Sequence, residues 1–248
     1  MKVVSFLLII LFLFGVNCGK KDVTVKSMEG LEPAELLEKG DNAFNKGNMD
    51  EAIEAYEIIY ERYPTSREYI DAVIGMARSY NNRGDFERGF NLLYNLIREN
   101  MVPSRVPEIY NEMARYYEVT AAYSKEAGIS SEQDDFKSAI SFYNKSVSYP
   151  NSDDRKAKSY AQYQIGELQS KLGNYDDAAL AYQATLYNYS GTEWATLAEQ
   201  RLTQLRQEGK ANISPIKKEM APSQPEMTPA TGEEAIPETA APDTSGSN

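Results

Sequence analysis

Apolar and small residues recur every three to four positions through most of the chain, in stretches separated by turn-forming residues. The first stretch predicts a helix that begins at Pro33, a residue suited to a first helical turn, and ends before Gly47. A second helix is expected from Asp50, a residue type that caps helix starts, to Tyr63, before Pro64 ends it. The hydrophobic pattern therefore predicts a pair of packed helices joined by a tight turn.

The same pair of helices returns three more times along the sequence. Each second helix has a small residue, which lets two helices approach closely, followed one turn later by a larger one. The small residues are Ala52, Gly89, Ala139 and Ala178, and the larger ones are Tyr56, Leu93, Tyr143 and Tyr182. Further helices are expected at 69–82, 85–99, 110–121, 136–149, 154–172, 175–189 and 194–205.

This order of small, aromatic and turn positions resembles the tetratricopeptide repeat. The resemblance implies an all-α fold, a right-handed superhelical solenoid of about four helix pairs plus a capping helix, over residues 33–207. Gly89 stands where alanine is usual, at a cost of about 0.5 to 1 kcal/mol that a very close helix approach would offset. The third pair has surplus residues at 124–135, which predict a lengthened first helix and then a loop, either functional or merely tolerated.

The N-terminal segment has the pattern of a secretory signal. A charged start precedes about a dozen apolar residues, fewer than the ~20 that span a membrane. Cys18, the single cysteine, follows directly and resembles the acylated cysteine of a bacterial lipobox. We therefore expect a signal peptide at 1–17 and a lipidated N-terminus and tether at 18–32. An ordinary signal peptide with an incidental cysteine is the alternative, because two neighbouring positions depart from the usual lipobox residues.

Residues 208–248 lack the helical period, and prolines recur there among alanine, glutamate, threonine and serine. Such a composition cannot bury enough apolar surface to offset the entropy of ordering the backbone. We expect a disordered tail, which either reaches toward a partner or is an inert extension.

Composition excludes several function classes. The net charge of −11 and pI near 4.7 argue against nucleic acid as a partner, since phosphate binding needs clustered lysine and arginine. Histidine is absent, so the commonest general base and the commonest metal ligand are missing. We expect no cofactor, no metal and no enzymatic activity.

Three acidic pairs are the candidates for acid–base chemistry. They are Asp134 with Asp135, Asp153 with Asp154, and Asp176 with Asp177. Each pair lies where a helix is expected to begin, and carboxylates there cap exposed amides and stabilise the helix dipole. The structural interpretation is therefore preferred.

The concave groove of a tetratricopeptide array is lined by first helices, and projection of the repeat onto this chain gives its candidate groove residues. These peptide-groove candidates are Asp41, Asn45, Arg78, Asn81, Asn82, Asn111, Arg115, Glu118, Tyr160, Tyr163 and Glu167. Tyr160 and Tyr163 are the expected aromatic anchors for a peptide, because they fall outside the packing positions of the repeat. A merely solvated face is the alternative for each residue.

Residues 18–207 resemble the periplasmic tetratricopeptide lipoproteins, and above all the BamD family. The resemblance rests on Cys18 after an apolar run, on the repeats, and on an extended third repeat that ends in Tyr149-Pro150-Asn151-Ser152. The repeats near 174–205 are also similar to the YbgF (CpoB) family of the Tol-Pal system, although its N-terminal coiled coil is missing here.

The resemblance implies a non-enzymatic scaffold, anchored by lipid at the periplasmic face of the outer membrane. Its expected partners are envelope proteins, either components of β-barrel assembly or periplasmic domains. The alternatives are a YbgF-like role in Tol-Pal, division or wall coordination, an auxiliary role to a wall enzyme, and a weak wall hydrolase.

Overall fold

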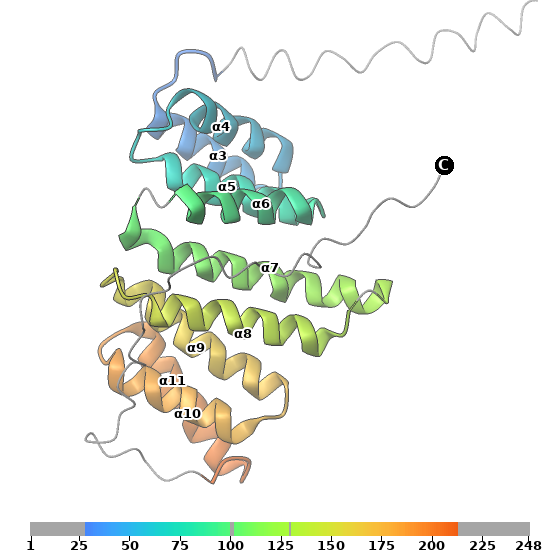
Figure 1. Cartoon of the computed structure of the whole chain (residues 1–248), viewed down its shortest axis with the longest axis vertical. Helices are drawn as coiled ribbons and strands as arrows, with labels where there is room; N and C mark the ends of the chain where they lie inside the picture. Colours follow the sequence, from blue (N-terminus) through green and yellow to red (C-terminus); the bar gives the residue numbers. More distant parts are fainter. Residues whose placement is uncertain (1–27, 100–101, 129, 213–248) are drawn as a thin grey trace, which may run out of the picture. The chain divides into compact units, whose positions relative to one another are not determined.

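The computed structural model describes residues 28–99, 102–128 and 130–212 (Figure 1). Within these ranges the regular structure is entirely helical, which confirms the all-α class predicted from the hydrophobic period. The chain divides into two compact units, Met1–Ser79 and Tyr80–Asn248, and each is described by itself.

The N-terminal unit contains α3 (Pro33–Asn45), α4 (Met49–Arg62) and most of α5 (Tyr69–Asn82). A capping box starts α3, in which the backbone amide of Glu32 donates to Oε2 of Glu35 at 3.0 Å. The start of α4 lies earlier than predicted, because Asn48 and not Asp50 occupies the N-cap position. A chain reversal at Gly47, with φ +80°, joins α3 to α4 as the sequence predicts.

The C-terminal unit stacks the remaining helices in chain order, each in contact with the next. They are α6 (Phe86–Glu99), α7 (Val106–Ala127), α8 (Glu132–Ser148), α9 (Arg155–Lys171), α10 (Tyr175–Asn188) and α11 (Glu193–Gln207). A short 3-10 turn, η1 (Pro103–Arg105), precedes α7. In Figure 1, α7, α8 and α9 run as successive layers, with α10 and α11 beyond them.

The third pair has the predicted lengthened first helix followed by a loop, but the loop is shorter than expected. Residues 124–127 are the last turn of α7, residues 132–135 are the first turn of α8, and only 128–131 connect them. Gly128 caps α7 in a left-handed conformation with φ +67°. The surplus residues therefore lengthen both helices, because α7 continues up to its cap at Gly128 and α8 already begins after its cap at Ser131.

Both ends of the packed region extend beyond the predicted limits. Met28, expected in the tether, is 1% exposed, and the hydroxyl of Tyr63 donates to the carbonyl of Leu31 at 3.4 Å. At the other end, Ala211 is 7% exposed although the tail was predicted to begin at residue 208. The predicted signal peptide, Cys18 and the tail beyond residue 212 lie outside the described residues.

Two helix pairs are held by a tyrosine ring pressed against a glycine. Tyr56 of α4 is 1% exposed, and Cβ atoms added to Gly40 and Gly75 would lie 2.4 and 2.5 Å from its ring. Tyr182 of α10, also 1% exposed, meets Gly166 of α9 in the same way, at 2.4 Å. Only glycine gives the ring room there, so the glycine sets how closely the two helices approach.

We predict that Gly166→Ala destabilises the C-terminal unit by about 1 to 3 kcal/mol, because the added methyl group forces the buried Tyr182 ring to move. Without that clash, alanine would stabilise the helix by about 0.5 to 1 kcal/mol. Urea unfolding followed by circular dichroism measures the difference. In the double variant with Tyr182→Leu the penalty should be smaller than the sum of the two single changes. A Gly166→Ala chain as stable as the parent would contradict this account of the packing.

Candidate protein-binding face

In the C-terminal unit, α9 packs against α7 on one side and against α11 on the other, so the three helices form a continuous surface. The Nδ2 of Asn111 on α7 donates to the carbonyl of Ala157 on α9 at 2.9 Å. The ring centroids of Tyr160 on α9 and Trp194 on α11 are 4.9 Å apart. We call this surface the first-helix face, and its residues are Asn111, Glu112, Arg115, Glu118, Tyr160, Glu167, Lys171, Trp194 and Arg201.

Three ion pairs on the first-helix face share one arrangement, in which the cation is half exposed and the carboxylate is mostly buried. The pairs are Arg115–Glu112, Lys171–Glu118 and Arg201–Glu167, with N–O distances of 3.6, 3.8 and 3.0 Å. The cationic side chains are 50%, 53% and 48% exposed, against 7%, 21% and 20% for their carboxylates. The face therefore presents positive charge to solvent, although the whole chain is acidic.

Two of these carboxylates also accept hydrogen bonds from tyrosines of α8 and α10, the second helices of their pairs. The hydroxyl of Tyr143 donates to Glu118 at 2.5 Å, and that of Tyr182 donates to Glu167 at 2.7 Å. Burial, and then the neighbouring carboxylate, raise the pKa of both tyrosines above its ordinary value. Glu118 and Glu167, predicted as groove residues, are therefore parts of the helix-pair packing as well.

The same bond occurs in the N-terminal unit, where Tyr56 donates to Asp41 at 2.7 Å. Asp41 and Asn45 lie exposed on α3, and Arg78 is half buried on α5. Asn81 and Asn82 are in the last turn of α5, which belongs to the other unit. The predicted groove set is thus distributed over both units.

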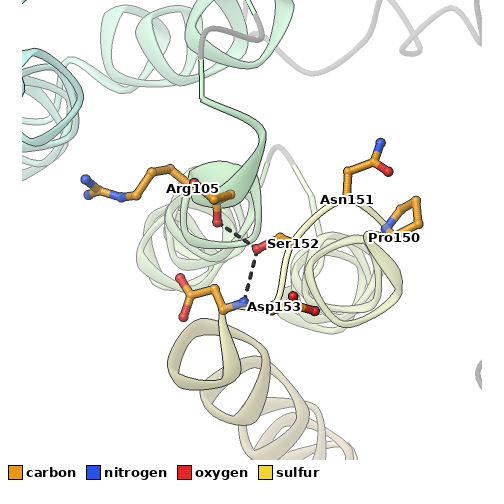
Figure 2. A pocket seen from close by; sticks show the side chains of 7 residues that line it. Arg105, Pro150, Asn151, Ser152 and Asp153 are labelled. Atoms are coloured by element: carbon orange, nitrogen blue, oxygen red, sulfur yellow. Dashed lines mark hydrogen bonds between the residues drawn. The ribbon is translucent and has the colours of Figure 1, made fainter.

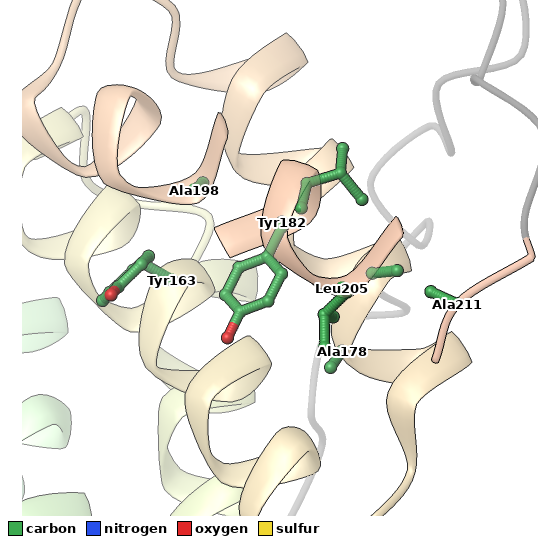
Figure 3. Packing of buried hydrophobic residues seen from close by; sticks show 8 residues of the cluster. Tyr163, Ala178, Tyr182, Ala198, Leu205 and Ala211 are labelled. Atoms are coloured by element: carbon green, nitrogen blue, oxygen red, sulfur yellow. The ribbon is translucent and has the colours of Figure 1, made fainter. Parts of the chain in front are cut away.

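The prediction of two aromatic anchors is wrong for Tyr163. This side chain is 7% exposed, and its ring centroid lies 5.5 Å from Trp194 and 5.8 Å from Tyr182. Figure 3 shows it inside the apolar cluster of α9, α10 and α11. Tyr160 is half buried, because Trp194 and Tyr143 cover part of its ring.

Two buried polar atoms under the first-helix face have no hydrogen-bond partner among the described residues. They are Oδ1 of Asn111, whose side chain is 4% exposed, and Nε1 of Trp194. Unsatisfied buried polar atoms are uncommon and cost about 1 to 3 kcal/mol each. Asn111 was a predicted groove residue, but its amide nitrogen is committed to α9, so its first role is to join two helices.

A hollow of about 590 Å³ lies beside the turn at 150–154 (Figure 2). Ser152, 6% exposed, donates to the carbonyl of Ser104 at 2.7 Å and accepts from the amide of Asp154 at 3.1 Å. Arg105 pairs with Glu108 at 2.6 Å. These bonds indicate a structural turn that joins the start of α7 to the start of α9.

All three acidic pairs lie at helix starts, as expected, and one of their members is a cap. Asp154 caps α9 by accepting from the amide of Ala157 at 2.9 Å. In α8 the cap is Ser131, and Asp134 lies in the first turn. Within the described ranges, no three histidine, cysteine, aspartate or glutamate side chains are grouped so that they could hold a metal ion. No helix in that part of the chain combines the length and apolar character needed to cross a membrane.

The family model for the tetratricopeptide repeat matches residues 36–66 and 160–192. These stretches contain the glycine–tyrosine contacts of both units, Gly40 with Tyr56 and Gly166 with Tyr182. No curated protein sequence matches the chain. Repeats of this kind are generally non-catalytic scaffolds whose surfaces bind other proteins. The chain therefore carries a scaffold for protein–protein interaction.

We predict that Tyr182→Phe lowers the free energy of unfolding at pH 7 by about 1.5 to 3 kcal/mol, because the charge-assisted bond to Glu167 is lost. The parent chain should also lose stability above about pH 10, where Tyr182 ionises more readily in the unfolded chain than in the folded one. Removing this hydroxyl should make the alkaline decline shallower. Urea titrations between pH 7 and pH 11 test both effects, and parallel stability curves for the two chains would refute the second.

Proposed function

We propose that this chain is a lipid-anchored scaffold of the bacterial envelope, which binds an acidic, extended segment of a partner protein on the first-helix face. One observation carries the binding proposal: the three half-exposed cations, each backed by a mostly buried carboxylate. Exposed ion pairs are worth only about 0 to 1 kcal/mol, so a carboxylate of a partner can engage these cations at little cost. The mostly buried carboxylates hold the cations in position for this contact.

An extended segment fits this face better than a small ligand does. The cations stand on three successive first helices. Lys171 and Arg201 line a common hollow of about 230 Å³, but Arg115 lies outside it. Tyr160, between them on α9, keeps part of its ring accessible and offers apolar contact next to the charges. A peptide that carries spaced carboxylates and an apolar residue matches such a row.

We expect that Arg115→Gln with Arg201→Gln weakens partner binding by about tenfold or more, because two of the three cations proposed to contact the partner lose their charge. Arg206→Gln is the matched control, since Arg206 is an exposed arginine of α11 outside the first-helix face. Affinity capture from envelope membranes, with quantification of the retained proteins at low and high salt, measures the effect. Equal loss in the control variant would refute a site on this face.

The anchor proposal rests on the sequence alone, in which Cys18 follows the apolar N-terminal run. Mass spectrometry of the mature N-terminus should find an acylated Cys18 as the first residue. An unmodified N-terminal residue other than Cys18 would rule the anchor out.

We place this scaffold in outer-membrane β-barrel assembly, by its resemblance to the BamD family. The lengthened α7–α8 pair, closed by the turn at Ser152, supports this choice, since an extended third repeat with a Tyr-Pro-Asn-Ser turn is part of that resemblance. Depletion of the protein should lower the amount of folded β-barrels in the outer membrane. Normal barrel levels together with a division or wall defect would instead favour the YbgF-like role.

A further inference from the structure

α10 carries apolar residues on its solvent side as well as on its packed side. Leu180 and Tyr187 are 45% and 41% exposed, and the half-buried Ala184 lies between them. Their spacing of four and three residues aligns them in one stripe along the helix. We call Leu180, Ala184 and Tyr187 the α10 stripe. A helix that is apolar all round usually has a second partner on its outer side.

The described chain ends at the beginning of this stripe. After α11, Gly209 reverses the backbone with φ +66°, and Ala211 enters the core cluster beside Ala178 and Leu205 (Figure 3). The amide of Asn212 donates to Oδ1 of Asp176 at 3.3 Å. Asp176 lies one helical turn before Leu180 on the same side of α10. The last described residue is therefore attached where the α10 stripe begins.

The residues that follow have the composition to cover the stripe. Residues 213–218 read Ile213-Ser214-Pro215-Ile216-Lys217-Lys218. Pro215 favours an extended, polyproline-like backbone, in which residues three apart lie on the same side. Ile213 and Ile216 would then be about 9 Å apart at ~3.1 Å per residue. Leu180 and Tyr187 are about 10 Å apart at ~1.5 Å per helical residue, so the two spacings match.

We propose that residues 213–218 bind along α10 of their own chain, with Ile213 and Ile216 packed on the α10 stripe. The attachment of Asn212 to Asp176 sets this direction, from the first turn of α10 towards its last.

A second copy of the chain fits the stripe less well. Two exposed apolar side chains provide far less surface than the ~1,200 to 2,000 Å² buried in a stable protein–protein interface. A segment tethered at Asn212 needs no such area, since its attachment gives it a high effective concentration at the stripe.

Trypsin cleavage after Lys217 and Lys218 tests the proposal, because a bound segment is cleaved only when it dissociates. In the purified full chain these sites should be cleaved at least about tenfold more slowly than in a free peptide of residues 213–248, equivalent to about 1.4 kcal/mol. Leu180→Ser with Tyr187→Ser should bring the rate to within about twofold of that of the free peptide. Leu197→Ser is the matched control, since Leu197 is a 37%-exposed apolar residue on α11, and it should leave the protection unchanged.

A second double variant controls for the case in which the α10 substitutions unfold the domain. Ile213→Ser with Ile216→Ser leaves every described residue unchanged and should abolish the protection equally. Cleavage of the parent chain at the rate of the free peptide would overturn the proposal, as would protection that survives both double variants. Protection that falls on dilution would also overturn it, because the segment would then bind another copy.

Discussion

The structure depends on a buried tyrosine that is pressed against a glycine of the neighbouring helix while its hydroxyl binds a carboxylate on that helix. Tyr56 makes this arrangement with Gly40 and Asp41, and Tyr182 makes it with Gly166 and Glu167. Burying such a ring contributes about 1.5 to 3 kcal/mol, and a hydrogen bond to a charged group contributes about 1.5 to 3 kcal/mol more. The contact sets the distance between the helices, and the bond sets their register, so both parts are needed.

This packing also organises the first-helix face. The carboxylate of Glu167 accepts a hydrogen bond from the hydroxyl of Tyr182 on the core side and forms an ion pair with Arg201 on the solvent side. Glu118 is placed in the same way between Tyr143 and Lys171. Because the core fixes the carboxylates, the cations are held in a row with half of each side chain exposed. The groups that stabilise the helix pairs thus position the groups proposed to bind a partner.

The middle of the chain departs from this scheme in a way that explains its weaker repeat signal. In α6, Leu93 stands where the other second helices have tyrosine, so no hydroxyl is available for a first-helix carboxylate there. The third pair keeps Tyr143 but is built from longer helices, α7 and α8. The family model matches the two stretches with the complete glycine–tyrosine contact and not the region between them.

The sequence by itself determined the helices, their turns and most of the core, because helical period, turn glycines and prolines act over a few neighbouring residues. It predicted α5 to the residue, and it placed Tyr56, Tyr143 and Tyr182 at repeat positions that the structure buries. Only the tertiary structure decided which first-helix residues stay exposed. Tyr163 became core since Trp194, thirty-one positions later, packs on it. Repeat spacing places a side chain on a face, but a distant segment decides whether that face is covered.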